Sequence, residues 1–214
     1  MKCPLGRPAG DDLTTPILLL AALLGIPPAT GGARATECDR IAAHPDDPDR
    51  VAPGVERNGM DLAKAAAACE AQLATDPANA RIRYQLARVL FYSGQQERAV
   101  KEMRAAADAG YRQAQFVFGA FISNRRDHAP QDVCLAEHYW LLAARNGRQA
   151  ARVSYVRHYL NGRFDVCDRR ADTAEMMQFL DEAAKAAGNY YEGMLIEDLA
   201  ARLGAIQQQV TGGY

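Results

Sequence analysis

Cysteine is the residue type with the clearest chemistry in this 214-residue chain. Beyond Cys3, near the amino terminus, the sequence holds Cys38, Cys69, Cys134 and Cys167. Thiols in an oxidising compartment form disulfides, and an even number of cysteines is typical of that use. We therefore expect two disulfides among these four residues, for which three pairings exist.

A zinc site is the alternative use of these cysteines. Cys134 and His138 are four residues apart and would share one helix face, with Cys167 and His128 as candidate further ligands. The sequence has no Cys-x-x-Cys pair to strengthen this hypothesis. Disulfides are therefore favoured, and we predict no metal and no other cofactor.

No catalytic pattern stands out among the remaining residues. The sequence has no His-Glu-x-x-His, no Gly-x-Ser-x-Gly and no phosphate-binding glycine loop. Ser93, Ser123 and Ser154 lack a lysine three residues later, which is the spacing of penicillin-recognising enzymes. The formal net charge of −1 also gives no general attraction to nucleic acid. These observations favour a protein that binds over one that catalyses.

A repeated phrase indicates the elements that must position these residues. Ala-Ala-Asp-Ala-Gly at 106–110 returns as Ala-Ala-Arg-Asn-Gly at 143–147, and each copy precedes an Arg-Gln-Ala triplet. A looser copy is Ala183-Ala184 followed by Gly188. A period of roughly 36 residues is typical of stacked helical hairpins, because one hairpin cannot bury its apolar face alone. We therefore predict an all-α protein.

Two related repeat families are similar to this pattern. The stretch from Ala80 resembles a tetratricopeptide repeat, with the small Ala87 and Ala99 where its two helices would cross. The following unit resembles a Sel-like repeat through an ordered set of residues: Ala114, Phe118-Gly119, Asp132, Ala136, Tyr139-Trp140, Ala143-Ala144 and Gly147. A third copy departs from the family at Val156 and Met176, where Gly and Ala are preferred, so we expect this hairpin to splay.

The resemblance covers about residues 61–188 and implies both a fold and a class of function. The implied fold is a right-handed α-solenoid of antiparallel hairpins, which a C-terminal helix at 192–208 would cap. The implied function is protein binding, and the resemblance implies no reaction.

The repeat register also bears on how the cysteines pair. Cys38 and Cys69 would lie on the two helices of the first hairpin. Cys134 would begin the second helix of one repeat, and Cys167 would lie in the enlarged loop of the next. Pairing Cys38 with Cys69 and Cys134 with Cys167 suits this placement, while the sequence leaves the other two pairings open.

We expect four segments along the chain. Residues 1–35 have a basic start, an apolar run at 17–26 that is too short to span a bilayer, and an Ala-Arg-Ala cleavage site, which together indicate a signal peptide. Residues 36–60 should form a short helix and an irregular segment over the first hairpin, 61–210 the solenoid, and 211–214 a flexible tail. The mature protein is then secreted or periplasmic in a bacterium, without stable membrane insertion.

The concave face, which the first helix of each hairpin would line, is the predicted binding site. Arginine can hold a carboxylate with two hydrogen bonds, tyrosine and phenylalanine supply apolar area, and asparagine can bond a peptide backbone. The register places the following residues there: Arg81, Tyr84, Arg88, Phe91, Tyr92, Phe116, Asn124, Arg157 and Asn161. This set suits an acidic or C-terminal segment of a protein partner.

We therefore predict a non-enzymatic scaffold or adaptor that binds another protein through its concave face. One alternative is a binder or hydrolase of cell-wall or β-lactam ligands, an activity associated with cysteine-rich Sel-like repeat proteins. The other is a structural module that assembles through the ends of the solenoid.

Overall fold

The computed structural model describes residues 34–168 and 171–211, all of which belong to one compact unit, Ala33–Tyr214. Within these residues the regular structure is entirely helical, as the repeat period predicted. The helices are α1 (Glu37–Ala42), the 3-10 turn η1 (Arg57–Gly59), α2 (Leu62–Thr75), α3 (Ala80–Tyr92), α4 (Gln96–Asp108), α5 (Arg112–Ser123), α6 (Val133–Arg145), α7 (Gln149–Leu160), α8 (Thr173–Lys185) and α9 (Tyr190–Thr211).

Two of the predicted segments fall partly or wholly outside the described residues. The expected signal peptide lies almost entirely there, since the description begins at Arg34. Of the expected tail, residues 212–214 also lie there, whereas Thr211 ends α9. None of the described helices, including the 22-residue α9, is long and apolar enough to cross a membrane.

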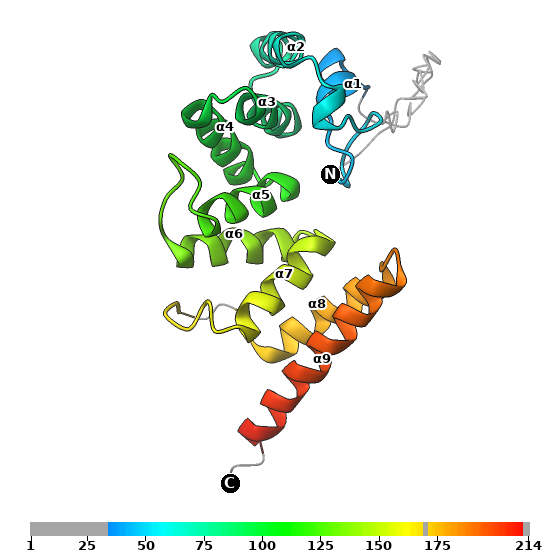
Figure 1. The fold of residues 1–214 in the computed structure, drawn as a ribbon, viewed down its shortest axis with the longest axis vertical. Coiled ribbons are helices and arrows are strands. Elements are labelled where there is room, and N and C mark those ends of the chain that lie inside the picture. Colours follow the sequence, from blue (N-terminus) through cyan, green and yellow to red (C-terminus); the bar gives the residue numbers. More distant parts are fainter. Residues whose placement is uncertain (1–33, 169–170, 212–214) are drawn as a thin grey trace, which may run out of the picture. The chain divides into compact units, whose positions relative to one another are not determined.

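Consecutive helices pack against one another from α2 to α9, so that α3–α4, α5–α6 and α7–α8 form successive hairpins (Figure 1). The repeated phrase of the sequence ends a helix in each copy. Gly110 and Gly147 have φ angles of 86° and 81°, in the left-handed region that glycine adopts without strain. The next amide in each case bonds back to the first alanine of the phrase, Tyr111 to Ala106 and Arg148 to Ala143. This closure satisfies carbonyl groups that a helix end leaves free.

Helix starts are fixed by side chains that accept hydrogen bonds from first-turn amides. Asp61 caps α2, and Asn79 caps α3. Asp132, the aspartate of the repeat pattern, accepts from the amides of Cys134 and Leu135 at the start of α6.

Small residues allow the hairpin helices to approach closely. A Cβ atom at Gly119 of α5 would lie only 2.7 Å from Cδ1 of Trp140 on α6, so no larger residue fits without movement. In the third hairpin Val156 and Met176 are both fully buried, and α7 and α8 contact each other less extensively than the helices of the two earlier hairpins. The smaller contact agrees with the expected splaying, because bulk at the crossing holds two helices apart.

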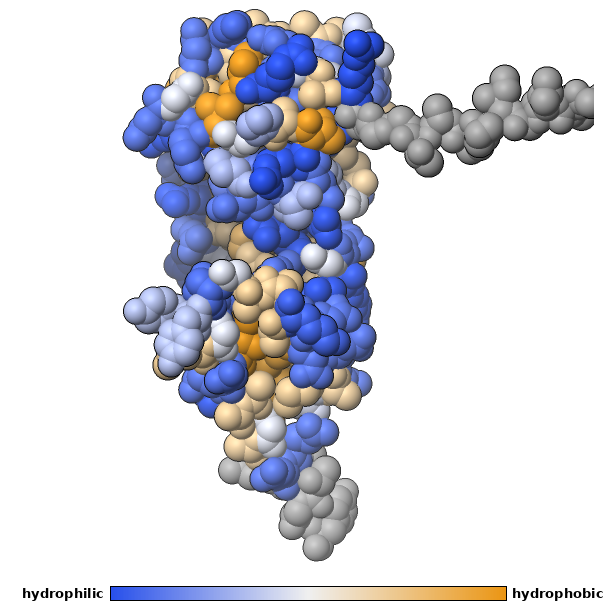
Figure 2. All heavy atoms as spheres, turned by 90° about the vertical axis from the view of Figure 1, so that its right-hand side faces the viewer, coloured by the Kyte–Doolittle hydropathy of each residue, from blue (hydrophilic) through white to orange (hydrophobic). Residues whose placement is uncertain are grey.

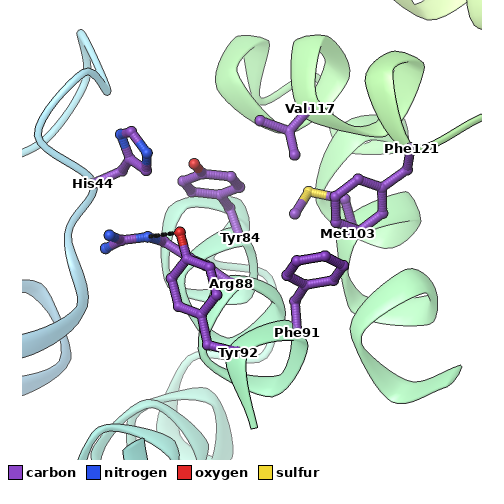
Figure 3. Close-up of a pocket in the computed structure, with 8 residues that line it drawn as sticks. All are labelled: His44, Tyr84, Arg88, Phe91, Tyr92, Met103, Val117 and Phe121. Atoms are coloured by element: carbon purple, nitrogen blue, oxygen red, sulfur yellow. Dashed lines mark hydrogen bonds between the residues drawn. The ribbon is translucent and has the colours of Figure 1, made fainter. Parts of the chain in front are cut away.

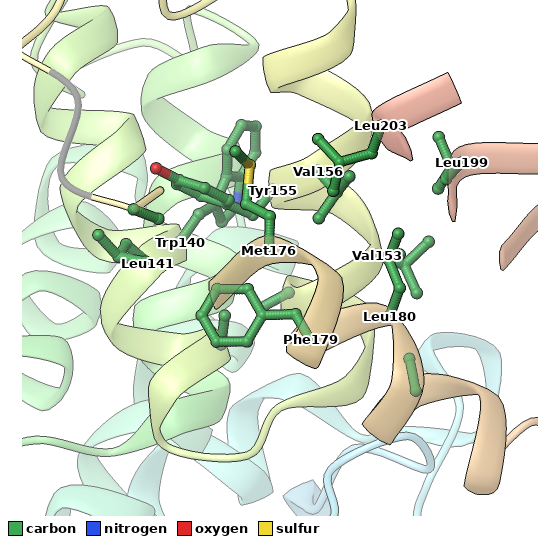
Figure 4. Close-up of a cluster of buried hydrophobic side chains, with 14 of the residues drawn as sticks. Trp140, Leu141, Val153, Tyr155, Val156, Met176, Phe179, Leu180, Leu199 and Leu203 are labelled. Atoms are coloured by element: carbon green, nitrogen blue, oxygen red, sulfur yellow. The ribbon is translucent and has the colours of Figure 1, made fainter. Parts of the chain in front are cut away.

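Helix α9 covers the last hairpin, as the predicted capping helix does. Its Ile196, Leu199 and Leu203 are buried in the cluster that includes Tyr155 of α7 and Phe179 of α8 (Figure 4). The helix packs against both α7 and α8 and begins two residues earlier than the sequence indicated.

Two disulfides join the four cysteines in the pairing that the repeat register favoured. Cys38 of α1 bonds Cys69 of α2, and Cys134 of α6 bonds Cys167 in the loop after α7. The zinc alternative is therefore wrong, because both of its thiols are consumed by the second disulfide. In the described part of the chain no three His, Cys, Asp or Glu side chains gather in a way that could hold a metal.

Removing either disulfide should destabilise the protein, and the two pairs form a matched comparison. They enclose 31 and 33 residues, so the chain-entropy cost of losing each is the same, about 3 to 4 kcal/mol. Cys38→Ala/Cys69→Ala should lose more unfolding free energy in urea than Cys134→Ala/Cys167→Ala, because Cys38 and Cys69 are fully buried. Equal losses would show that core packing around the first pair contributes nothing further.

Two glycine-to-alanine variants should have opposite effects on stability. Gly119→Ala forces the Trp140 ring to move and should cost about 1 to 3 kcal/mol. Gly204→Ala, in α9 with open space around its Cβ, should gain about 0.5 to 1 kcal/mol from helix propensity. Thermal or urea unfolding checks both, and destabilisation by Gly204→Ala would contradict the packing described for α9.

Candidate protein-binding site

A loop between α1 and α2 lies on the first helices of the stack and shapes the candidate site. This N-terminal loop (residues 43–55) is closed at its base by a hydrogen bond of 2.9 Å from the Val55 amide to the Ala43 carbonyl. Gly54 lies so close to Pro45 that a Cβ would be 2.2 Å from the proline Cα. The two ends of the loop are therefore in direct contact at its base.

Arg88 of α3 holds this base in place. Its guanidinium donates to the carbonyl oxygens of Ala42, Ala43 and Val55, at 3.1, 2.9 and 2.7 Å. The side chain is 4% exposed. Its hydrogen-bonding capacity is thus met by neutral carbonyl groups, which leave its positive charge in place.

The tip of the N-terminal loop reaches the start of α5. Asp47 is fully buried and accepts a hydrogen bond of 2.6 Å from the Tyr111 hydroxyl. Asp49 receives two hydrogen bonds from Arg112, at 2.7 and 2.6 Å. Burial raises the pKa of Asp47, although the Tyr111 hydrogen bond acts in the opposite direction. The irregular segment therefore spans two hairpins, where the sequence predicted contact with the first alone.

A buried ion pair fixes α1 to α3. Asp39 is fully buried and accepts from Arg81 at 2.8 and 3.1 Å and from Gln85 at 2.9 Å. Burial acts to raise the pKa of Asp39, but the hydrogen bonds from Arg81, Thr36 and Gln85 prevail and hold it below its ordinary value.

The expectation that Arg81 and Arg88 line an open groove is therefore wrong. Arg81 is engaged by Asp39, and Arg88 by the carbonyl groups of the N-terminal loop. Sequence periodicity placed both side chains on the correct face of α3. It could not indicate that the preceding segment of the same chain covers that face.

Beside the N-terminal loop the structure forms a cavity of about 120 Å³, the aromatic pocket (Figure 3). Its lining comes from the loop and from three helices. The residues are His44 of the loop, Tyr84, Arg88, Phe91 and Tyr92 of α3, Met103 of α4, and Val117 and Phe121 of α5. The rings of Phe91 and Phe121 pack against each other on one side of it, with centroids 4.9 Å apart and planes tilted by 36°.

The aromatic pocket thus brings together four of the nine predicted groove residues, Tyr84, Arg88, Phe91 and Tyr92. On the α5 side of the pocket, the sequence prediction was wrong by one position along the helix. We expected Phe116 there, whereas Val117 and Phe121, one turn apart, line the cavity. Phe116 instead lies beneath the Arg148 guanidinium, 5.3 Å from its ring centroid.

The remaining predicted residues lie away from the aromatic pocket. Asn124 and Asn161 are the C-caps of α5 and α7, and Arg157 is exposed on α7. The side chain of Asn161 accepts a hydrogen bond from Arg202 of α9 at 3.4 Å. These three residues therefore do not line the aromatic pocket.

Guanidinium groups surround the aromatic pocket. Arg57 and Arg88 lie over the Tyr92 ring at 5.4 and 5.2 Å, and Arg126 lies over the Phe91 ring at 5.7 Å. Arg57 and Arg126 are exposed, and neither forms an ion pair with another described residue. Burial and the charge of Arg88 lower the pKa of His44. The site is an apolar cavity with guanidinium groups at its rim, and the carboxylates of Asp46 and Glu56 act on His44 from the side of the N-terminal loop.

The Asp39–Arg81 pair should make stability depend on pH in the acid range. Because the pKa of Asp39 is lower in the folded than in the unfolded chain, its contribution is complete above about pH 5 and is lost as the pH falls through the folded pKa. Asp39→Asn should cost about 3 kcal/mol at pH 7 and much less near pH 2. Urea unfolding across this range measures it, with Glu37→Gln of the exposed Glu37–Arg40 pair as the control that changes little. A pH-independent difference would contradict this role of Asp39.

No protein-family model and no curated protein matches this chain. Among solved structures, the chain is similar to a Sel1 repeat protein from Oxalobacter formigenes. The two are 21% identical with a TM-score of 0.47, and the match covers 67% of this chain and 99% of that one. The evidence for the helical hairpins and their register is this chain's own packing. The glycines end helices, Asp132 caps α6, and Gly119 lies at a helix crossing, as the Sel-like pattern requires.

Proposed function

We propose that this protein is an exported, non-enzymatic scaffold that binds another protein through the aromatic pocket and the surface around it. The observation that carries the proposal is the size and lining of the cavity. A cavity of about 150 Å³ lined by apolar side chains holds a molecule the size of benzene, whereas drug-sized ligands need about 300 to 1,000 Å³. At about 120 Å³ the aromatic pocket suits one large apolar side chain from a partner.

The chemistry of the lining supports binding over catalysis. The eight lining residues include no Ser, Thr, Cys, Lys, Asp or Glu that could act as a nucleophile beside His44. Tyr84 is almost fully buried, and its hydroxyl accepts a hydrogen bond from Gln113. The aromatic pocket is also too small for a β-lactam or a muropeptide, so it gives the hydrolase alternative no support.

Export is supported by the cysteine chemistry. Two structural disulfides are typical of proteins that fold in an oxidising compartment, and they are rare in the cytosol of mesophiles. The basic, apolar and small-residue order of residues 1–35 agrees with delivery to such a compartment.

Filling the aromatic pocket should weaken partner binding without unfolding the protein. Val117 is half-buried and points into the cavity from α5, so Val117→Phe should occupy the space of the partner's side chain (Figure 3). Val166→Phe is the matched control, because Val166 is 81% exposed in the loop after α7. Residues 36–214 would be used to capture partners from an extracytoplasmic extract of the source cells, followed by calorimetry with the partner identified.

We expect Val117→Phe to weaken binding by about tenfold or more, since blocking a buried anchor typically costs over 1.4 kcal/mol. Val166→Phe should bind like the unmodified protein. Equal capture by both variants, with unchanged unfolding temperatures, would move the interface away from the aromatic pocket.

A further inference from the structure

We propose that α9 of a second copy of this chain docks into the aromatic pocket, so that copies join head to tail. This inference rests on the pocket being a binding site, as proposed above, and adds the identity of one occupant. It follows from two surfaces of the same chain that complement each other in both apolar character and charge.

The first surface is the side of α9 that exposes large apolar and aromatic side chains. Tyr190, Tyr191, Met194 and Leu195, the α9 patch, are 75%, 80%, 49% and 37% exposed. The helix is held to the stack by other residues, Ile196, Leu199 and Leu203, which are buried. The patch is therefore not needed for capping. Figure 2 shows a face on which hydrophilic residues predominate and hydrophobic residues gather in separate patches.

Carboxylates follow the α9 patch along the helix. Tyr190, Met194 and Glu197 are spaced to share one face, and Leu195 and Asp198 belong to the neighbouring row. Glu197 is exposed and forms no ion pair within the described residues. Asp198 meets Arg202 at 3.5 Å on the surface, a contact of little strength. The patch is thus an apolar surface next to available negative charge.

The aromatic pocket presents the opposite combination. Arg57 and Arg126 stack on its rings with no carboxylate partner in the described chain, and the charge of Arg88 is not neutralised by the carbonyl groups it binds. A tyrosine or methionine side chain matches the cavity, and a carboxylate one turn further along can reach the rim. Guanidinium groups freed from competing anions are well suited to such pairing.

The occupant must come from another molecule. Helix α9 is fixed on α7 and α8 by its buried leucines and by the hydrogen bonds that Glu192 accepts from Gln149 and Gly188, so it cannot leave to reach its own pocket. Because the α9 patch and the aromatic pocket are different surfaces, the contact is heterologous. Repetition of such a contact gives rings or open chains of copies.

Complementation between two variants tests the proposal. Arg126→Glu disables the pocket rim and leaves α9 intact, whereas Tyr190→Ser/Tyr191→Ser/Met194→Gln disables the α9 patch and leaves the pocket intact. All four side chains are at the surface, so folding should be unaffected. Lys101→Glu, an exposed lysine of α4 without an ion pair, is the control for the change in net charge.

Sedimentation velocity of residues 36–214 at concentrations up to about 100 μM detects the weak affinities of small interfaces. The unmodified chain and Lys101→Glu should associate with rising concentration, and each disabled variant should stay monomeric. An equimolar mixture of the two disabled variants should form complexes no larger than a dimer, because one working contact remains per pair.

Three results would overturn the proposal: a monomeric unmodified chain, association that survives in either disabled variant, or a mixture that does not pair. A monomeric chain that still captures a foreign protein, and loses it in Val117→Phe, would leave the proposed function standing and remove only the second copy as occupant. Self-association without capture of a foreign protein would keep the second copy as occupant and remove the proposed binding of another protein.

Discussion

The structure depends on closing the two ends of a helical stack, because a terminal helix has no following hairpin to bury its apolar side. At the carboxyl end a single long helix meets this need, and Leu199 and Leu203 of α9 complete the last cluster of buried side chains. At the amino end α1 has only six residues, too few to hold a helix by themselves. Its place is secured instead by a disulfide, a buried ion pair and one arginine.

That arginine links the support of α1 to the aromatic pocket. Arg88 binds the base of the N-terminal loop through neutral carbonyl oxygens while its guanidinium lies over Tyr92 in the aromatic pocket. Holding the loop therefore also brings His44 to the cavity and leaves a positive charge there. The shape and charge of the pocket are consequences of how the amino end is closed.

Much of the fold could be predicted from the sequence, because it depends on local signals. The glycines that end helices, the aspartates that begin them and the small residues at the crossings each act within one or two turns, and all are visible as a repeat. Four residues of the aromatic pocket were found for the same reason, since they lie on one face of α3.

The rest depends on contacts that leave no periodic signal. The path of the N-terminal loop is set by side chains 33 to 64 residues away, such as Arg88 and Tyr111, so it could not be read from its prolines and aspartates. The prediction for the α5 side of the pocket was wrong by one residue, because a helical face is wide enough to include both Phe116 and Val117. The fold was thus predictable from the repeat. The lining of the aromatic pocket was predictable only for the residues that lie together on α3.

The order of the disulfides along the chain has a consequence for biogenesis. Each of these cysteines is bonded to its neighbour in sequence, Cys38 to Cys69 and Cys134 to Cys167, and the two covalent loops neither overlap nor nest. In a chain delivered amino terminus first to an oxidising compartment, the correct partner is always the next thiol to arrive. With Cys3 removed together with the proposed signal peptide, vectorial oxidation would give this pairing directly, without reshuffling by an isomerase.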